Sequence, residues 1–365
     1  MIKKKILIAT GGTGGHIFPA YSLANYLIKE EYNVKLTTDQ RGLSFLKDYK
    51  NLNLIKMPSS PLIRKNFFIF LISMIKIINS TIRSFFYLLF NRPSMIIGMG
   101  GYSSFPICFA AYFLKIKFII YESNLIIGKA NRYLLPFAKK VFVSYKELEG
   151  ISQKHKNKII EIGNLVREEI INFKTAHYEM SKLDKMNILI LGGSQGAKIF
   201  SEELPEIFKE LKKNNKLMIK IYHQCQKNQN DKLSEFYQNN KIDYEIFNFT
   251  NKIIDYYQKV NLVITRSGAS VLGELINVNI PFISIPLPSS ADNHQHKNAE
   301  FYEKKGYGFL LREKDIKNKL YDLINLIFKD ESLIKNIISN QKKYSDKYIF
   351  KNVHIQIKKE LNEKN

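Results

Sequence analysis

Two short apolar runs, each followed directly by a glycine-rich loop, lie about half a chain apart in this 365-residue sequence. "KKKILIAT" leads into "GGTGG" at 11–15, and "MNILIL" leads into "GGSQG" at 192–196. Gly12 and Gly193 are 181 residues apart, and helical periodicity follows each loop. A strand, a glycine loop and a helix in that order open a doubly wound α/β sheet. The repeat therefore predicts two such domains, which also suits the length of the chain.

Six further apolar runs are typical of the buried strands of parallel sheets. They span 94–100, 117–122, 140–145, 217–223, 261–266 and 281–286. We predict an α/β protein with two Rossmann-like doubly wound domains that face a cleft, and ligands at the carboxyl ends of the strands. The N-terminal domain is predicted to span 1–163 and the C-terminal domain 164–344. A helix at about 345–365 is predicted to pack back on the first domain, and the polar segment 174–185 is predicted to be a linker.

Composition narrows the class of protein. The chain has 45% hydrophobic and 24% charged residues, as globular proteins do. Its two cysteines exclude a disulfide framework and fit a reducing cytoplasm, and the strand near the N-terminus argues against a signal peptide. The net charge is +23, and residues 49–121 carry nine Lys or Arg and no acid. This local excess of positive charge favours an acidic partner.

Two more glycine clusters end predicted strands, at 98–106 and 265–275. A glycine loop that enters a helix can bind a phosphate group. Ile17 stands where the dinucleotide fingerprint needs glycine, and no Gly-Lys-Ser/Thr follows, so dehydrogenases and P-loop NTPases are disfavoured. Glu274, one turn after Ser270, could bind a ribose diol, or it could be a surface residue near a helix start. Asp39, after the strand-like "VKLTT", is interpreted as an ordinary strand-end residue.

These motifs resemble those of a known family when they are taken together and in order. They are "GGTGGHIFPA", "GMGGYSSFP", "YESNLIIGKANRYL", "GNLVR", "GGSQGAK", "RSGASVLGEL" and "ADNHQHKNAEF", between residues 11 and 301. The chain is identified as similar to the MurG family, the membrane-associated N-acetylglucosaminyltransferases of peptidoglycan synthesis with the GT-B fold. The resemblance implies inverting transfer from UDP-N-acetylglucosamine to the C4 hydroxyl of undecaprenyl-pyrophosphoryl-N-acetylmuramyl-pentapeptide (lipid I), which gives lipid II. It also implies no cofactor and no metal.

The resemblance assigns the substrates to the two halves. In the C-terminal half Ser194 is expected at the diphosphate, Glu274 at the ribose diol and Gln295 at the sugar. Arg167 and the helix start at 269–274 flank the nucleotide, and Thr250 is expected at the uracil. The substrate-binding residues implied in this way are Thr13, Gly14, Gly15, Asn124, Arg167, Ser194, Thr250, Ala269, Ser270, Val271, Leu272, Gly273, Glu274 and Gln295.

Inverting transfer needs a base for the acceptor hydroxyl and stabilisation of the leaving diphosphate. His16 is the predicted catalytic base, because the pKa of a histidine lies near working pH, although a single histidine can also serve for capping or packing. Glu122 and Tyr102 are reserve candidates. His294 and His296 alternate like metal ligands, but no third ligand is evident, so we expect no metal site.

The chain departs from the family pattern at three places. Leu165 stands where the family has proline, and Tyr121 replaces a histidine before Glu122. In "HQCQK", Cys225 and Gln226 replace serine and glycine. Gln226 restricts a backbone that glycine leaves free, which puts the contacts of this loop in doubt.

The acid-free region contains the most apolar segment, 64–92. Its longest apolar run, Phe67–Ile75, is shorter than the ~20 residues of a membrane-spanning helix. The segment could form helices packed on the N-terminal sheet or a patch that contacts anionic lipid. We expect most of its residues in the core. The surplus aromatic and basic residues predict peripheral contact with an anionic membrane, at the cytoplasmic face of the bacterial inner (plasma) membrane.

Three alternatives remain besides a MurG-type transferase. A different GT-B enzyme or a UDP-sugar 2-epimerase would share the donor half but not the lipid-facing half. A basic nucleic-acid-binding protein would leave the glycine loops unexplained, and no nucleic-acid motif accompanies the cations, so we expect no nucleic acid. A nucleotide-sensing module would need Glu274 and Ser194 but not His16.

Overall fold

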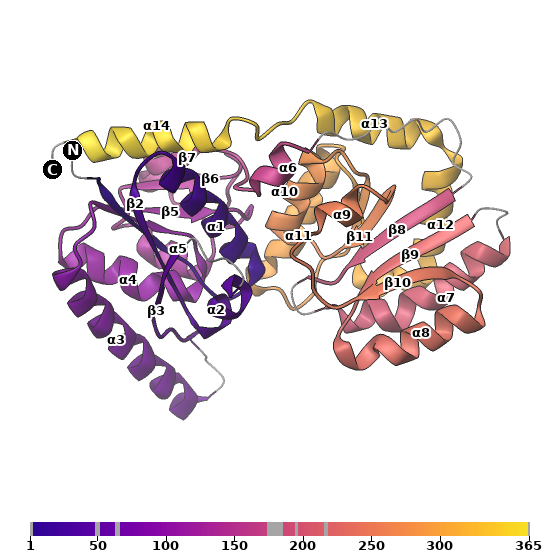
Figure 1. Ribbon diagram of the computed structural model, residues 1–365, viewed down its shortest axis with the longest axis horizontal. Helices are drawn as coiled ribbons and strands as arrows, with labels where there is room; N and C mark the ends of the chain where they lie inside the picture. Colours follow the sequence, from indigo (N-terminus) through magenta and orange to yellow (C-terminus); the bar gives the residue numbers. More distant parts are fainter. Residues whose placement is uncertain are drawn as a thin grey trace. The chain divides into compact units, whose positions relative to one another are not determined.

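The computed structural model describes residues 3–47, 52–62, 66–173, 185–193, 196–214 and 218–363. The chain divides into two compact units, Met1–Arg167 with Asp346–Asn365, and Glu168–Ser345 (Figure 1). The first unit continues to Arg167, four residues beyond the predicted end of the N-terminal domain at 163, because the intervening segment is hydrogen-bonded to this unit. The backbone N–H of Asn164 donates to Asp346 Oδ1 at 3.0 Å. Most of the predicted linker lies outside the described residues, and Lys185 begins a strand.

The described residues of the first unit form a seven-stranded parallel sheet in the order β3-β2-β1-β4-β5-β6-β7. The strands are β1 (Lys5–Ala9), β2 (Asn33–Thr38), β3 (Asn53–Lys56), β4 (Met95–Gly98), β5 (Phe118–Glu122), β6 (Lys140–Val143) and β7 (Ile159–Glu161). β4 and β5 are buried at every position. Helices on both faces of a parallel sheet explain such continuous apolar strands.

Helices cover this sheet on two sides. They are α1 (Gly14–Lys29), α2 (Gln40–Leu46), α3 (Phe67–Phe90), α4 (Gly101–Phe113), α5 (Lys129–Leu134) and α14 (Ile349–Asn362). α4, α5 and Leu88 of α3 share one core cluster with the central strands. α14 returns to the first unit and contacts α1, where the rings of Tyr26 and Phe350 stack with centroids 5.2 Å apart (Figure 1).

The described residues of the second unit form a six-stranded parallel sheet in the order β10-β9-β8-β11-β12-β13. Its strands are β8 (Lys185–Leu191), β9 (Met218–Gln224), β10 (Asp243–Phe247), β11 (Leu262–Thr265), β12 (Phe282–Ser284) and β13 (Phe309–Leu310). Its helices are α6 (Glu168–Ile171), α7 (Lys198–Asn214), α8 (Asn230–Asn239), α9 (Ile254–Tyr257), α10 (Ala269–Asn277), α11 (His294–Lys304), α12 (Ile316–Lys329) and α13 (Glu331–Lys342). α7, α8 and α12 pack on the sheet in one core cluster.

Both sheets have the strand order of the Rossmann fold, in which the order reverses between the first and fourth strands. This switch point lies between β1 and β4 in the first unit and between β8 and β11 in the second. Ligands of such sheets bind outside the carboxyl ends of the strands at that point. The four glycine loops singled out in the sequence follow β1, β4, β8 and β11. The prediction of two doubly wound domains is confirmed.

The apolar segment 64–92 differs from the prediction that most of it is core. α3 is one continuous helix of 24 residues, and it packs on α4 (Figure 1). The buried positions are Ser73, Ser80, Ser84 and Leu88. The exposed large side chains are Phe67, Phe68, Leu71, Ile72, Ile75, Ile78, Ile82, Phe86, Leu89 and Phe90.

The buried serines of α3 satisfy their own hydroxyl groups. Ser80 and Ser84 donate to the carbonyl oxygens four residues earlier, at 2.8 Å each. Small residues let two helices approach closely, so the polar stripe faces α4 and the apolar side chains face outward. By length and composition alone, α3 also meets the criteria for a membrane-crossing helix, which the interrupted apolar run did not predict.

Candidate functional site

The first switch point brings two glycine loops into direct contact. The loop after β1 reaches α1 at Gly14, and the loop after β4 reaches α4 at Gly101. A Cβ atom on Gly11 would overlap the side chain of Ser103 in α4. Only glycine therefore allows this approach. Thr13 is the exposed N-cap residue of α1, and its side chain does not cap the helix.

His16 lies in the first turn of α1, and its imidazole packs against the loop after β4. A Cβ atom on Gly100 would lie 3.2 Å from His16 Cε1, and one on Gly101 would lie 3.3 Å from His16 Cδ2. Both glycines have φ angles in the left-handed region, +85° and +72°. The ring is half-buried and lies beside both loops of the switch point. The structure therefore places His16 next to Thr13, Gly14 and the second glycine loop, at the carboxyl ends of β1 and β4.

Glu122 ends β5 and holds the loop that follows it. Its Oε1 accepts hydrogen bonds from the backbone N–H and the side-chain amide of Asn124, at 3.1 and 2.8 Å. Its Oε2 accepts from the N–H of Gly128 and from Asn131 Nδ2, at 2.9 Å each. The carboxylate is only 3% exposed. These four bonds occupy both oxygens, so the geometry gives Glu122 a structural task and fixes the predicted substrate residue Asn124.

The interpretation of Asp39 as an ordinary strand-end residue is wrong. Its Oδ1 accepts from the N–H groups of Gly12 and Gly42, at 3.2 and 2.9 Å. Its Oδ2 accepts from the hydroxyls of Tyr102 and Ser103, at 3.1 and 3.2 Å. Burial alone would raise the pKa of Asp39, but these hydrogen bonds lower it below its ordinary value. An ionised carboxylate thus joins the two glycine loops.

The hydroxyl of Tyr102, the reserve candidate for a base, donates to this carboxylate. Burial and then the negative charge of Asp39 raise the pKa of Tyr102. A phenol that remains protonated cannot act as a general base near neutral pH.

Arg167 is buried at the end of the first unit. Its guanidinium carbon lies 5.5 Å from the centroid of the Phe18 ring, which is on α1. This cation–π contact ties the last residue of the first unit to the helix that carries His16.

The second switch point contains the loops after β8 and β11. Ser194, predicted at the diphosphate, lies outside the described residues. The loop after β11 leads into α10 at Ala269, and its N-cap residue Gly268 has no side chain to cap the helix. In α10, Ala269, Leu272 and Gly273 are buried, whereas Ser270 and Val271 are half-buried and can be approached from outside.

Glu274 is 6% exposed, and the hydroxyl of Tyr257 in α9 donates to its Oε2 at 3.2 Å. Arg266 fixes the start of the same loop. Its Nη2 lies 2.5 Å from Glu313 Oε2, and its guanidinium carbon lies 4.7 Å from the centroid of the Phe200 ring. Neither Tyr257 nor Arg266 was among the predicted site residues, because Tyr257 belongs to no motif and Arg266, although it begins the "RSGASVLGEL" motif, was given no role there.

Gln295 and Thr250 follow the carboxyl ends of two other strands of the same sheet, β12 and β10. Gln295 Oε1 accepts from the N–H of Leu287 at 2.9 Å, and Thr250 Oγ1 accepts from the N–H of Lys252 at 3.0 Å. Asp292 and Asn293, just before α11, both have left-handed φ angles, 51° and 57°. Such strained backbone is common at binding sites. All the described residues predicted for the donor from 250 to 295 therefore follow strand ends at one edge of the sheet.

The two histidines in the first turn of α11 both contact neighbouring groups. His294 Nδ1 lies 2.7 Å from the carbonyl oxygen of Ala291, and His296 Nε2 lies 3.1 Å from Glu300 Oε1. In the part of the chain that the structure describes, three or more metal-ligating side chains do not come together anywhere.

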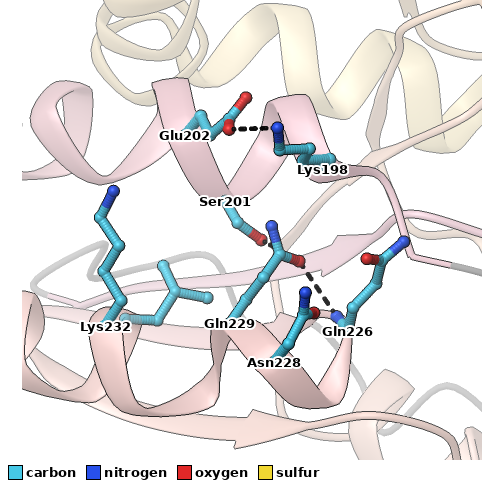
Figure 2. A pocket seen from close by; sticks show the side chains of 8 residues that line it. Lys198, Ser201, Glu202, Gln226, Asn228, Gln229 and Lys232 are labelled. Carbon is cyan, nitrogen blue, oxygen red and sulfur yellow. Dashed lines mark hydrogen bonds and ion pairs between the residues drawn. The ribbon is translucent and has the colours of Figure 1, made fainter.

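A surface pocket of about 230 Å³ lies between α7 and α8 (Figure 2). Its lining residues are Lys198, Ser201, Glu202, Gln226, Asn228, Gln229, Lys232 and Leu233. Lys198 and Glu202 form an ion pair at 3.2 Å, and Ser201 donates to Gln229 Oε1 at 3.2 Å. None of the predicted site residues lines this pocket.

Gln226 lies between this pocket and the glycine loop after β8. A Cβ atom on Gly196 would lie 3.2 Å from both Cγ and N of Gln226. Glutamine in place of the family's glycine at position 226 thus puts a side chain directly against the glycine loop after β8.

Known proteins resemble both halves of the chain. The Glycosyltransferase family 28 N-terminal domain matches residues 6–143, and the C-terminal domain of the same family matches residues 187–362. The sequence is 38% identical over 366 residues to the UDP-N-acetylglucosamine--N-acetylmuramyl-(pentapeptide) pyrophosphoryl-undecaprenol N-acetylglucosamine transferase of Pelagibacter ubique (strain HTCC1062), covering 99% of this chain and 100% of that one. A protein of the same name from Rickettsia bellii (strain RML369-C) is 36% identical over 350 residues, covering 93% and 96%.

Solved structures share the fold. MurG of Acinetobacter baumannii superposes with a TM-score of 0.77 at 24% identity, covering 98% of this chain and 99% of that one. UDP-GlcNAc 2-epimerase from Neisseria meningitidis, bound to UDP-GlcNAc, has a TM-score of 0.66 at 15% identity, covering 97% and 100%. These likenesses confirm the GT-B fold.

Proposed function

Because the chain belongs to the family of UDP-N-acetylglucosamine--N-acetylmuramyl-(pentapeptide) pyrophosphoryl-undecaprenol N-acetylglucosamine transferases, we propose that it transfers N-acetylglucosamine from UDP-N-acetylglucosamine to the C4 hydroxyl of lipid I and so forms lipid II. It is a glycosyltransferase of family 28. The observation that carries the proposal is the pair of switch points, each with two glycine loops, in the two halves that match the family.

The acceptor belongs to the first unit in this proposal. His16 takes the proton of the C4 hydroxyl as that oxygen attacks the anomeric carbon, because its ring lies beside the α1 N-terminus and the second glycine loop. Thr13, Gly14, Gly15 and Asn124 surround the acceptor and the sugar. Attack on the face opposite the leaving group inverts the anomeric centre.

The donor belongs to the second unit. Glu274 accepts hydrogen bonds from the ribose diol, and Tyr257 orients its carboxylate. The N-terminus of α10 and the loop with Ser194 stabilise the negative charge that develops on the departing UDP. Thr250 contacts the uracil, Gln295 contacts the sugar, and Arg167 flanks the nucleotide. Leu272, which the family resemblance also implied, has no exposed surface.

The enzyme is proposed to act as a peripheral protein at the cytoplasmic face of the bacterial inner membrane. The outward face of α3 presents ten large apolar side chains to solvent, and Phe67 and Phe68 are more than 70% exposed. Transfer of one such side chain into an apolar phase stabilises binding by about 1.5–3 kcal/mol. Lys76 and Arg83 are exposed on the same helix and suit anionic headgroups. A lipid-linked acceptor requires contact of this kind.

The proposal is tested with the purified chain, labelled UDP-N-acetylglucosamine and a lipid-linked muramyl-pentapeptide acceptor. We expect label in the lipid fraction and release of UDP in equal amounts, only when the acceptor is present. Conversion of the donor to its C2 epimer without the acceptor would favour an epimerase. Release of UDP without labelled lipid would contradict the proposed acceptor.

A further inference from the structure

The carboxylate of Asp39 connects three parts of the first unit that are distant in sequence. Its partners within 3.2 Å are the loop after β1 (Gly12), the start of α2 (Gly42), and the first turn of α4 (Tyr102 and Ser103), as described above. Asp39 is only 6% exposed, and four N–H or O–H groups within 3.2 Å donate to it. A buried carboxylate with these partners stabilises one arrangement of the segments.

Two of these segments, the loop after β1 and the loop that leads into α4, flank His16. The backbone of His16 is held by two hydrogen bonds, since His16 N donates to Thr13 O at 3.1 Å and Thr10 Oγ1 donates to His16 O at 2.9 Å. Its imidazole lies against Gly100 and Gly101. Asp39 binds both segments, at Gly12 in the loop that carries His16 into α1 and at Tyr102 directly after Gly101.

We propose that Asp39 is a positioning residue for the transfer reaction, which holds the two glycine loops of the first switch point at the separation that fixes the imidazole of His16. The inference rests on the proposed function. Asp39 is buried, and both of its carboxylate oxygens are occupied by donors from the protein itself. Because its hydrogen bonds keep the carboxyl pKa low, it is charged at neutral pH. When it is removed, the loops separate more freely and the ring loses its orientation toward the acceptor oxygen.

Kinetics of Asp39→Ala and Asp39→Asn test this role. A misplaced catalytic group lowers the rate by up to about 100-fold, so we expect Asp39→Ala to lower kcat by roughly 10–100-fold. The KM for UDP-N-acetylglucosamine is expected to stay within about twofold, because the residues proposed for the uracil, the ribose and the diphosphate (Thr250, Glu274 and Ser194) belong to the second unit. Asp39→Asn keeps one oxygen for the N–H groups of Gly12 and Gly42, and the hydroxyls can turn to accept from its amide. It should therefore recover most of the lost kcat.

Leu46→Ala is the matched control. Leu46 is buried at the other end of α2, so this change destabilises the helix that Asp39 caps but keeps the Asp39 carboxylate and its four donors. Assayed at a temperature where all variants are folded, Leu46→Ala should keep the wild-type kcat. If Asp39→Ala keeps it too, or if both variants lose activity equally, Asp39 has only a structural role and the inference is overturned.

A second measurement separates this inference from the proposed function. The imidazole of His16 is followed by NMR in the wild type and in Asp39→Ala. We expect one sharp signal in the wild type and a broadened or split signal in the variant. If the wild type transfers no sugar but the signal changes in this way, the function fails and the positioning role stands. An unchanged signal would overturn the positioning role whatever the activity.

Discussion

Replacing Glu122 with glutamine decides between the two roles considered for this residue, catalytic base and loop anchor. The carboxylate is buried and accepts four hydrogen bonds, two at each oxygen. Glutamine has nearly the same shape, but it replaces one oxygen by an NH₂ group. Two of the four donors would then face another donor, either the pair from Asn124 or the pair from Gly128 and Asn131.

The expected loss of unfolding free energy follows from these lost hydrogen bonds. A hydrogen bond to a charged group contributes about 1.5–3 kcal/mol, so two of them give a loss of about 3 kcal/mol at the lower end. For a unit of this size, that loss lowers the unfolding temperature of the first unit by roughly 6–12 °C. Glu161→Gln is the control, because the Glu161–Lys146 ion pair is exposed at the surface and its loss costs at most about 1 kcal/mol.

Thermal unfolding and hydrogen exchange of the 124–131 backbone provide the assay. We expect Glu122→Gln to unfold at a lower temperature and to exchange faster in this loop, with turnover falling because Asn124 is no longer fixed. A variant with wild-type stability and exchange but no turnover would refute the anchoring role and make Glu122 the base.

Two further predictions concern the pH dependence of stability in the second unit and the binding of α3 in the first unit to anionic vesicles. Burial lowers the pKa of His223 to about 3, so below pH 6.5 the unfolded chain takes up a proton that the folded chain refuses. The second unit should therefore lose about 2 kcal/mol of unfolding free energy between pH 6.5 and 5, and denaturant titrations of His223→Gln should lack this contribution. If the unfolding free energy of His223→Gln falls as steeply with decreasing pH as that of the wild type, the prediction is contradicted. On α3, joint reversal of Lys76 and Arg83 to Glu should weaken binding to anionic vesicles by roughly 30-fold or more, at about 1 kcal/mol per cation. Reversal of Lys335 and Lys342 on α13 is the control, and unchanged vesicle binding by the α3 variant would show that these cations do not contact lipid.

The central strands of both sheets could be predicted from the sequence, and the edge strands could not. The eight predicted strands and "VKLTT" are all interior strands of the two sheets. β3, β7, β10 and β13 are the outermost strands, and their residues are mostly half-buried or exposed. An edge strand has neighbours on one side only, so its sequence lacks the continuous apolar run that marks an interior strand.

α3 shows the limit of hydrophobic periodicity. The apolar pattern of residues 67–90 correctly predicts a helix, but it does not say which face is buried. The rule that apolar residues face the core is largely reversed here, because Ser73, Ser80 and Ser84 are buried whereas Phe67, Phe68, Phe86 and Phe90 are exposed. Only the close packing of the two helices shows this.

The glycine loops of the site were predictable, since each marks the end of a central strand. The residues that hold them were not. Asp39 reaches Tyr102 across 63 positions, and Tyr257 reaches Glu274 from a separate helix. Contacts of this kind depend on the strand order, which brings distant segments together. An Asp three residues before Gly42, in a typical N-cap position, was the one local signal for Asp39.

The central claim is that the acceptor binds at the first switch point and the donor at the second. Steady-state kinetics of His16→Ala and Glu274→Gln, measured with UDP-N-acetylglucosamine and the lipid-linked acceptor, test this claim most directly. We expect His16→Ala to lower kcat by about 100-fold or more with little change in the donor KM, in the range of general-base effects. Glu274→Gln should raise the donor KM with a much smaller effect on kcat. If both variants change kcat and donor KM in the same proportion, or if His16→Ala turns over at the wild-type rate, the assignment of acceptor and donor to separate units is contradicted.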